Sequence, residues 1–143
     1  MKGRLLDTVN FTGHSNVRAT NSSTIEVTTE DYLTLRGDCI IGILADKSCS
    51  NLSDEAKLWL ERDDSKVIIR IKVLEKEFEF IAMGSSKLSH TSNVSMVIRK
   101  SSFISERTLA VKAGAAAKDI PREMIAYLQK GEKGRLEIYS YHL

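Results

Sequence analysis

Three short polar segments contain the side chains best suited to bind or transform a ligand. They are GHSNVR at residues 13–18, LRGDC at 35–39 and IRKSS at 98–102. Each combines a cation with a hydroxyl, amide, carboxylate or thiol, and such groups together suit phosphates and carboxylates. The candidate ligand-binding residues are His14, Asn16, Arg18, Arg36, Gly37, Asp38, Arg99, Lys100 and Ser101.

In the first segment, His14 follows a glycine, which lets the backbone turn. Asn16 and Arg18 lie two and four residues after it, so the three polar side chains could converge on an anion. His14 could also act as a general base, because the pKa of an unperturbed histidine lies near neutrality. The simpler interpretation is a solvated loop with an asparagine in its turn.

In the second segment, Asp38 stands at the start of an apolar run and after Gly37. Its carboxylate could accept backbone N–H groups across the turn, or it could pair with Arg36 or Arg18. Cys39 would be a nucleophile only if a nearby base or cation lowered its pKa. A buried thiol is the simpler interpretation of that position.

In the third segment, Arg99 and Ser101 share one face of an expected strand, because alternate side chains point to opposite faces. A guanidinium beside a hydroxyl suits a phosphate or a carboxylate. The alternative interpretation is an exposed strand end without a ligand.

Standard catalytic and metal motifs are missing from the sequence. It contains no phosphate-binding or dinucleotide-binding glycine loop, and no zinc-protease or serine-hydrolase motif. Cys39 and Cys49 lack the CxxC spacing of metal and redox sites. We therefore expect no metal site, and no particular cofactor is indicated.

Composition is that of an ordinary globular chain. The 143 residues are 42% hydrophobic and 28% charged, which fits one domain over residues 1–143. No apolar run approaches the roughly 18 residues of a membrane-spanning helix, and the N-terminal residues do not resemble a signal peptide, so we expect a cytoplasmic protein. A net charge of +2 and an aromatic content of 6% do not favour RNA binding, but leave it open.

Hydrophobic periodicity predicts the elements that must position the three segments. Two helices are expected at residues 51–62 and 119–130, with Asn51 and Asp119 as N-caps. The continuous apolar run at 39–45 predicts a strand buried on both faces. The full set of expected strands is 5–12, 23–28, 39–45, 66–73, 75–84, 95–100, 107–113 and 134–141.

The second half of the sequence repeats the pattern of the first. A shift of 68 positions lays the second helix on the first, and a shift of 71 aligns the strands upstream. The two shifts differ by three positions, which predicts a three-residue insertion in the first half, near residues 34–37. We therefore expect a β-rich α+β domain built from two duplicated β-β-β-α-β units, at about 5–73 and 76–141. Their strands would form a mixed sheet or a partly closed barrel with two helices.

The three segments also resemble an archaeal family known as domain of unknown function 371. The matching motifs are Gly-His-x-Asn, Arg-Gly-Asp-Cys-Ile-x-Gly and Met-Val-x-Arg-Lys-Ser, in that order over nearly the whole chain. The resemblance implies a small archaeal cytosolic protein and locates a site without supplying a reaction. Carried onto this sequence, the motif residues are Gly13, His14, Asn16, Arg36, Gly37, Asp38, Cys39, Gly42, Arg99, Lys100 and Ser101.

The favoured function is binding of a small anionic ligand, such as a nucleotide or a phosphorylated metabolite, in a cleft between the two repeats. In that hypothesis Arg18, Arg36 and Arg99 neutralise the anion, and other polar residues of the three segments orient it. One alternative is an enzyme in which His14 or Asp38 is the base and Cys39 the nucleophile. Another is an adaptor that binds RNA or protein, and a homodimer is left open.

Overall fold

The computed structural model describes residues 1–142, and their elements occur twice in the same order. The first half contains β1 (Lys2–Thr12), β2 (Thr24–Thr28), β3 (Ile40–Gly42), the 3-10 helix η1 (Cys49–Asn51), α1 (Asp54–Leu60) and β4 (Lys66–Val73). The second contains β5 (Lys76–Met83), β6 (Ser95–Arg99), β7 (Thr108–Ala110), η2 (Ala117–Asp119), α2 (Arg122–Gln129) and β8 (Lys133–Tyr141). The chain is therefore α+β and β-rich, as its sequence predicts.

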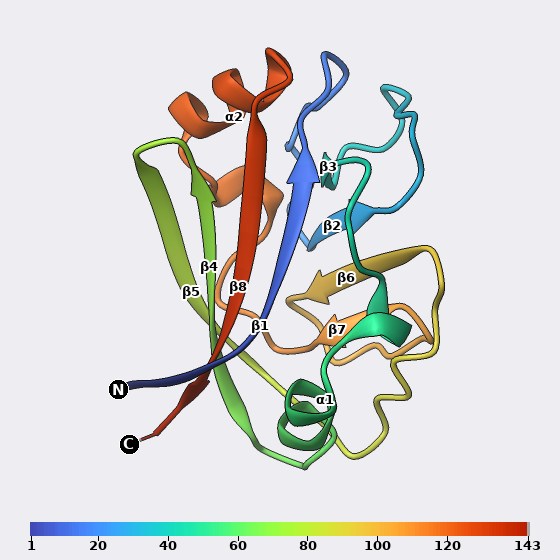
Figure 1. Ribbon diagram of the computed structural model, residues 1–143, viewed down its shortest axis with the longest axis vertical. Coiled ribbons are helices and arrows are strands. Elements are labelled where there is room, and N and C mark those ends of the chain that lie inside the picture. The colour runs from blue at the N-terminus through green and yellow to red at the C-terminus, as the bar shows by residue number, and fades with distance from the viewer. Residues whose placement is uncertain (143) are drawn as a thin grey trace.

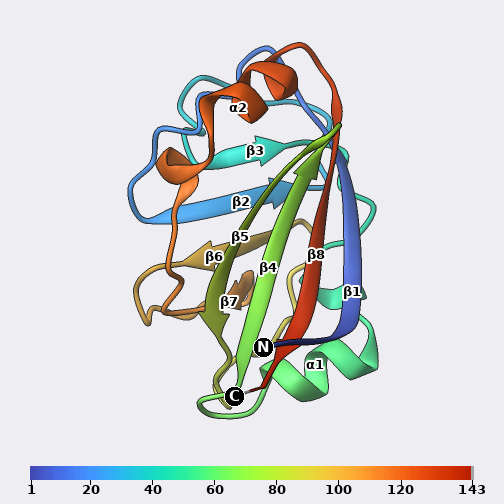
Figure 2. The same ribbon diagram turned by 90° about the vertical axis from the view of Figure 1, so that its left-hand side faces the viewer.

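The strands form two four-stranded sheets, and each sheet combines strands from both halves. The sheet β1-β8-β4-β5 is antiparallel, whereas β3-β2-β6-β7 is mixed, with an antiparallel β2–β6 pair at its centre and parallel outer strands. The sheets face and cross each other, with α1 and α2 at opposite ends (Figures 1 and 2). Single bridges, Thr12–Ile43 and Met83–Val111, link their edges, so no continuous ladder closes a barrel within residues 1–142.

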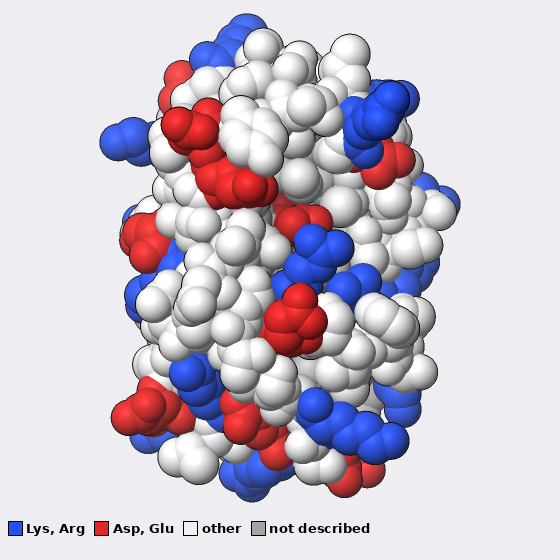
Figure 3. Space-filling view, turned by 90° about the vertical axis from the view of Figure 1, so that its right-hand side faces the viewer, with Lys and Arg blue, Asp and Glu red and all other residues white. Residues whose placement is uncertain are grey.

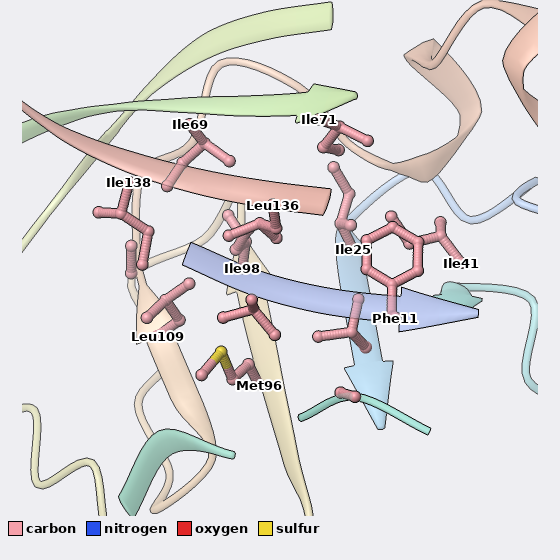
Figure 4. Close-up of a cluster of buried hydrophobic side chains, with 14 of the residues drawn as sticks. Phe11, Ile25, Ile41, Ile69, Ile71, Met96, Ile98, Leu109, Leu136 and Ile138 are labelled. Atoms are coloured by element: carbon pink, nitrogen blue, oxygen red, sulfur yellow. The ribbon is translucent and has the colours of Figure 1, made fainter. Parts of the chain in front are cut away.

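The core lies between the two sheets and follows from strand periodicity. Along β4 the buried side chains alternate with partly exposed ones, because neighbouring side chains point to opposite faces. Each fully buried aliphatic side chain stabilises the fold by about 1.5–3 kcal/mol. Figure 4 shows both sheets contributing to one cluster, with labelled side chains Phe11, Ile25, Ile41, Ile69, Ile71, Met96, Ile98, Leu109, Leu136 and Ile138.

Backbone geometry supports the predicted alignment of the two halves. Ala19 and His90, which are 71 positions apart, have φ angles of 51° and 50°. Leu44 and Lys112, which are 68 positions apart, have φ angles of 54° and 50°. The β2–β3 connection covers residues 29–39 and the β6–β7 connection covers 100–107, so the three extra residues lie where the two shifts place them.

The first helix begins later than predicted, and Asn51 is not its N-cap. α1 begins at Asp54, because the Ser53 hydroxyl accepts the backbone N–H of Ala56 at 3.0 Å. The side-chain oxygen of Asn51 instead accepts the N–H of Ser48 at 3.0 Å and closes η1. A short polar side chain that bonds to nearby backbone competes with helix formation, which explains the delay.

The second helix shows the same delay, and Asp119 is not its N-cap. The Asp119 carboxylate accepts the N–H of Ala116 at 2.9 Å and belongs to η2. Pro121 occupies the N-cap position, and its carbonyl accepts the N–H of Met124 at 3.0 Å. Ile120 is extended because a proline disfavours the helical conformation in the residue before it.

The prediction of a long strand at residues 39–45 with both faces buried is wrong. β3 ends at Gly42, and the side chain of Leu44 is 52% exposed. The N–H of Leu44 donates to the Glu30 carbonyl at 2.9 Å, which draws the backbone out of the sheet into a left-handed turn. Lys112 makes the same turn, so the predicted strand at 107–113 shortens to β7.

Two glycines allow the halves to interlock. A Cβ atom on Gly13, at the end of β1, would overlap the backbone carbonyl of Leu128 in α2. A Cβ atom on Gly84, after β5, would overlap the carbonyl of Leu60 in α1. The last turn of each helix thus packs against backbone from the other half, and the missing side chain permits that approach.

We predict that Gly13→Ala and Gly84→Ala each lower the free energy of unfolding by about 1–3 kcal/mol, because the added methyl groups overpack a rigid backbone contact. Urea denaturation followed by circular dichroism would measure the loss. Gly114→Ala is the matched control, since its Cβ would meet only one atom at an ordinary 3.6 Å. Equal losses in all three variants would contradict the explanation.

Candidate anion-binding site

The first predicted segment packs against the β2–β3 connection. The Asn16 amide donates to the Leu33 carbonyl at 2.7 Å, and the Arg18 guanidinium donates to the Leu35 carbonyl at 3.1 Å. His14 Nδ1 accepts the backbone N–H of Asn16 at 2.9 Å, so this histidine closes its own turn. These three side chains fix the loop and lie beside the second predicted segment.

In the second segment, Asp38 forms a corner. Its backbone carbonyl accepts the N–H groups of Thr20 at 3.0 Å and Asn21 at 3.2 Å. Its carboxylate accepts the side-chain amide of Asn21 at 3.1 Å. Within residues 1–142 it forms no ion pair with Arg18 or Arg36, and both arginines are exposed. The predicted capping of backbone N–H groups by the Asp38 carboxylate is not seen: the backbone carbonyl accepts them, and the carboxylate binds the Asn21 side chain instead.

The third segment leads into a polar cluster on the outer face of the sheet β3-β2-β6-β7. Arg99 ends β6, and its Nε donates to Thr108 Oγ1 at 2.9 Å. Its Nη2 donates to Ser105 Oγ at 3.2 Å. The ring of Phe103 lies over the guanidinium, 4.9 Å from its central carbon to the ring centroid. The outer-face cluster, as we define it, comprises Glu26, Cys39, Arg99, Ser105, Arg107 and Thr108.

Arg99 is a half-buried cation without a carboxylate partner. Among residues 1–142, no Asp or Glu oxygen lies within 4 Å of its guanidinium nitrogens, whereas Arg107 Nη1 lies 3.9 Å from Glu26 Oε2. Burial, and then the nearby charge of Arg107, lower the pKa of Arg99, although a guanidinium stays protonated at neutral pH. The negative charges of Glu26 and Glu106 act in the opposite direction on the Arg99 pKa, but neither carboxylate lies within 4 Å of the guanidinium.

Cys39 belongs to the same cluster as a protonated thiol. Its Sγ donates to Glu26 Oε1 at 3.5 Å. Burial first, and the negative charge of Glu26 as well, raise the pKa of Cys39 to about 11. Cys49, which is fully buried, has its pKa raised by burial to about 12. These environments disfavour the nucleophile that the enzyme hypothesis assigns to Cys39.

The surface hollows do not contain the predicted site residues, although Ser102 of the third segment lines the second of them. Of the four that can be described, the largest has a volume of about 680 Å³ and lies between α1 and the terminal strands. None of the four is lined by a predicted site residue. A ligand on the outer-face cluster would therefore contact a largely open surface.

The outer face of this sheet is mixed in charge. Figure 3 views the molecule from that side and shows Lys and Arg interspersed with Asp and Glu. A continuous basic stripe, which is the usual electrostatic signature of a nucleic-acid-binding surface, is not seen in this view.

Two further observations concern metal binding and membrane insertion. Within residues 1–142, no three His, Cys, Asp or Glu side chains are grouped so that they could hold a metal ion. In the same range, no helix has the length and apolar character needed to cross a membrane.

Sequence reasoning missed most of the neighbours of Arg99. Ser105, Thr108 and Phe103 come from β7 and from the connection before it, and the parallel β6–β7 pairing places them beside Arg99. Glu26 comes from β2, 73 residues earlier. The one available signal was a second arginine, Arg107, at the start of the next predicted strand, eight residues after Arg99.

Alkylation should distinguish a buried thiol from an activated one at Cys39. Raising the pKa of a thiol from 9 to about 11 lowers its thiolate fraction, and hence its alkylation rate, about 100-fold at neutral pH. We expect iodoacetamide to modify the folded protein far more slowly than the urea-unfolded chain, as read by intact mass. Cys49→Ser would isolate the Cys39 signal, and fast labelling of that folded variant would contradict the assignment.

Comparisons with known proteins agree with the motifs. The family model described as a domain of unknown function, DUF371, matches residues 9–141. An uncharacterised protein from Methanocaldococcus jannaschii is 46% identical over 121 residues, which cover 85% of this chain and 89% of that protein. The matched region includes all three predicted segments and both sheets. This chain belongs to the DUF371 family.

Proposed function

We propose that this domain binds a small anionic ligand, a nucleotide or another phosphate-bearing or carboxylate-bearing metabolite, on the outer face of the sheet β3-β2-β6-β7. The observation that carries the proposal is the state of Arg99. Its guanidinium is half-buried, lies near a second arginine and has no carboxylate within 4 Å among residues 1–142. A desolvated, unpaired cation is costly, and an anion would offset that cost.

The groups around Arg99 suit an oxyanion. Ser105 and Thr108 accept hydrogen bonds from two of its nitrogens, so the planar guanidinium group is positioned before any ligand binds. The exposed residues Lys100 and Ser101 follow directly in the β6–β7 connection and could supply a second cation and a hydroxyl donor. Phe103 is 61% exposed, and its ring could pack against the apolar part of a ligand.

The other predicted segments can contribute from the side of β2. The Asp38 carboxylate accepts from the Asn21 amide, and the Asn21 oxygen accepts the Thr24 hydroxyl at 3.1 Å. Thr24 lies opposite Arg99 in the β2–β6 ladder. Hydrogen bonds thus connect Asp38 with the strand position that faces Arg99. The remaining predicted residues would only support the loop that contains Asp38, or form outer contacts with a larger ligand. They are His14, Asn16, Arg18, Arg36 and Gly37.

Ligand-dependent stabilisation is the test of the proposal. We expect inorganic phosphate, pyrophosphate or adenosine monophosphate to raise the melting temperature of the protein in a saturable way. A ligand at 100 times its dissociation constant adds about 2.7 kcal/mol to the free energy of unfolding. Arg99→Gln should weaken binding at least tenfold, because hydrogen bonds to a charged group contribute about 1.5–3 kcal/mol.

Matched variants separate the site from general charge effects. Lys133→Gln removes the same charge from an exposed position on the other sheet and should bind like the wild type. Arg99→Lys keeps the charge but loses the planar fork, so it should retain only part of the affinity. The proposal fails if sodium chloride at equal ionic strength stabilises the protein equally, or if folded Arg99→Gln binds as the wild type does.

A further inference from the structure

A concave site separate from the outer-face cluster lies at the opposite end of the molecule from α2, between α1 and the two terminal strands. It is the hollow of about 680 Å³, within the range of small-molecule sites. We call it the terminal groove and define it by Arg4, Leu6, Leu58, Trp59, Arg62 and His142; Glu55 and Ser140 complete its lining. None of these residues belongs to the outer-face cluster.

Aromatic and apolar groups form the groove's contact surface. The Trp59 indole N–H donates to the Lys66 carbonyl at 2.8 Å, which fixes the ring. The guanidinium carbon of Arg62 lies 5.1 Å from the Trp59 ring centroid, and the His142 ring meets that ring edge-on at 5.2 Å. Leu58 is 72% exposed, which is unusual for a large aliphatic side chain. A planar apolar ligand could cover these rings and Leu58.

The charge in the terminal groove is positive. Arg4 pairs with Glu55 at 2.5 Å, so these two charges largely cancel. Arg62 has no carboxylate oxygen within 4 Å among residues 1–142, and its recorded partner is the Trp59 ring. The groove therefore offers one cation with free donors next to an aromatic surface.

The second half of the chain shares part of the groove's chemistry and differs at the aromatic residue. A bulge in β1 between Leu5 and Asp7 shifts the register, so Arg4 corresponds to Lys76, and the Arg4–Glu55 ion pair has its counterpart in Lys76–Glu123 at 3.2 Å. The equivalent of Trp59 is Tyr127, whose hydroxyl donates to Glu75 at 2.9 Å. The ion pair is thus common to both halves, whereas Tyr127 is bonded to a carboxylate and Trp59 lies beside the cation Arg62.

From this juxtaposition we propose that the terminal groove binds a small planar aromatic molecule that carries an anionic substituent. The ring system packs against Trp59 and Leu58, and the acidic group pairs with Arg62. His142 and Ser140, at the end of β8, border the same space and supply further polar contacts. The volume and the charge of the groove select this ligand class, independently of Arg99.

Trp59 is the only tryptophan of the chain, so its fluorescence reports directly on the terminal groove. The probe is anilinonaphthalene sulfonate, an aromatic anion, and N-phenylnaphthylamine has the same rings without the charge. We expect the sulfonate to quench Trp59 fluorescence saturably with one dye per chain. The uncharged dye and the Arg62→Gln variant should each show about tenfold weaker binding.

Variants at equivalent positions complete the test. Lys130→Gln alters the exposed residue that corresponds to Arg62 in the second half, and it should leave dye binding unchanged. Leu58→Glu places a negative charge on the apolar wall of the groove, which repels the sulfonate and should abolish the quenching. Circular dichroism checks that the variant is folded. Quenching that does not saturate, equal affinity for the uncharged dye, or equal loss in Arg62→Gln and Lys130→Gln would each overturn the proposal.

Discussion

The antiparallel pairing of β2 with β6 is the interaction on which the rest of the structure depends. Its five residue pairs run from Thr24–Arg99 to Thr28–Ser95, with Glu26–Val97 at the centre. Residues 26 and 97 are themselves 71 positions apart, so the approximate twofold relation between the halves passes through this pair. Because each sheet takes strands from both halves, neither half buries its apolar faces without the other. The glycine contacts with the ends of α1 and α2 extend the same interlocking to the helices.

Side chains of β2 and β6 that point away from the core are where the two halves differ most in chemistry. Arg99 is equivalent to Thr28, Glu26 to Val97, and Cys39 to Arg107, so the relation that holds for the backbone is broken for charge. The resulting surface has a half-buried arginine whose neighbours are hydroxyls and an aromatic ring. The terminal groove differs less between the halves, since Trp59 and Arg62 correspond to Tyr127 and Lys130, which are also an aromatic residue and a cation.

Much of the fold could be predicted from the sequence, and the failures have local physical causes. The alternating pattern of residues 66–73 matched β4 at both ends, because one face of that strand is buried along its whole length. The helix starts were wrong, because Asn51 and Asp119 bond to backbone of their own 3-10 helices rather than cap α1 and α2. Arg99 and Ser101 could be named as candidate anion ligands from residue types alone. The neighbours of Arg99 could not, because only the parallel β6–β7 pairing brings Thr108 beside it.

Nuclear magnetic resonance of the arginine Nε–H groups during titration with adenosine monophosphate tests the central claim most directly. The account predicts that the Arg99 signal, whose donor now faces Thr108, shifts saturably. The signal of Arg70, which is held by Glu79 at 2.6 Å on the other sheet, should stay in place. An Arg99 signal that remains unchanged, or that moves together with that of Arg70 as ionic strength rises, would contradict an anion site on the outer face of the β3-β2-β6-β7 sheet.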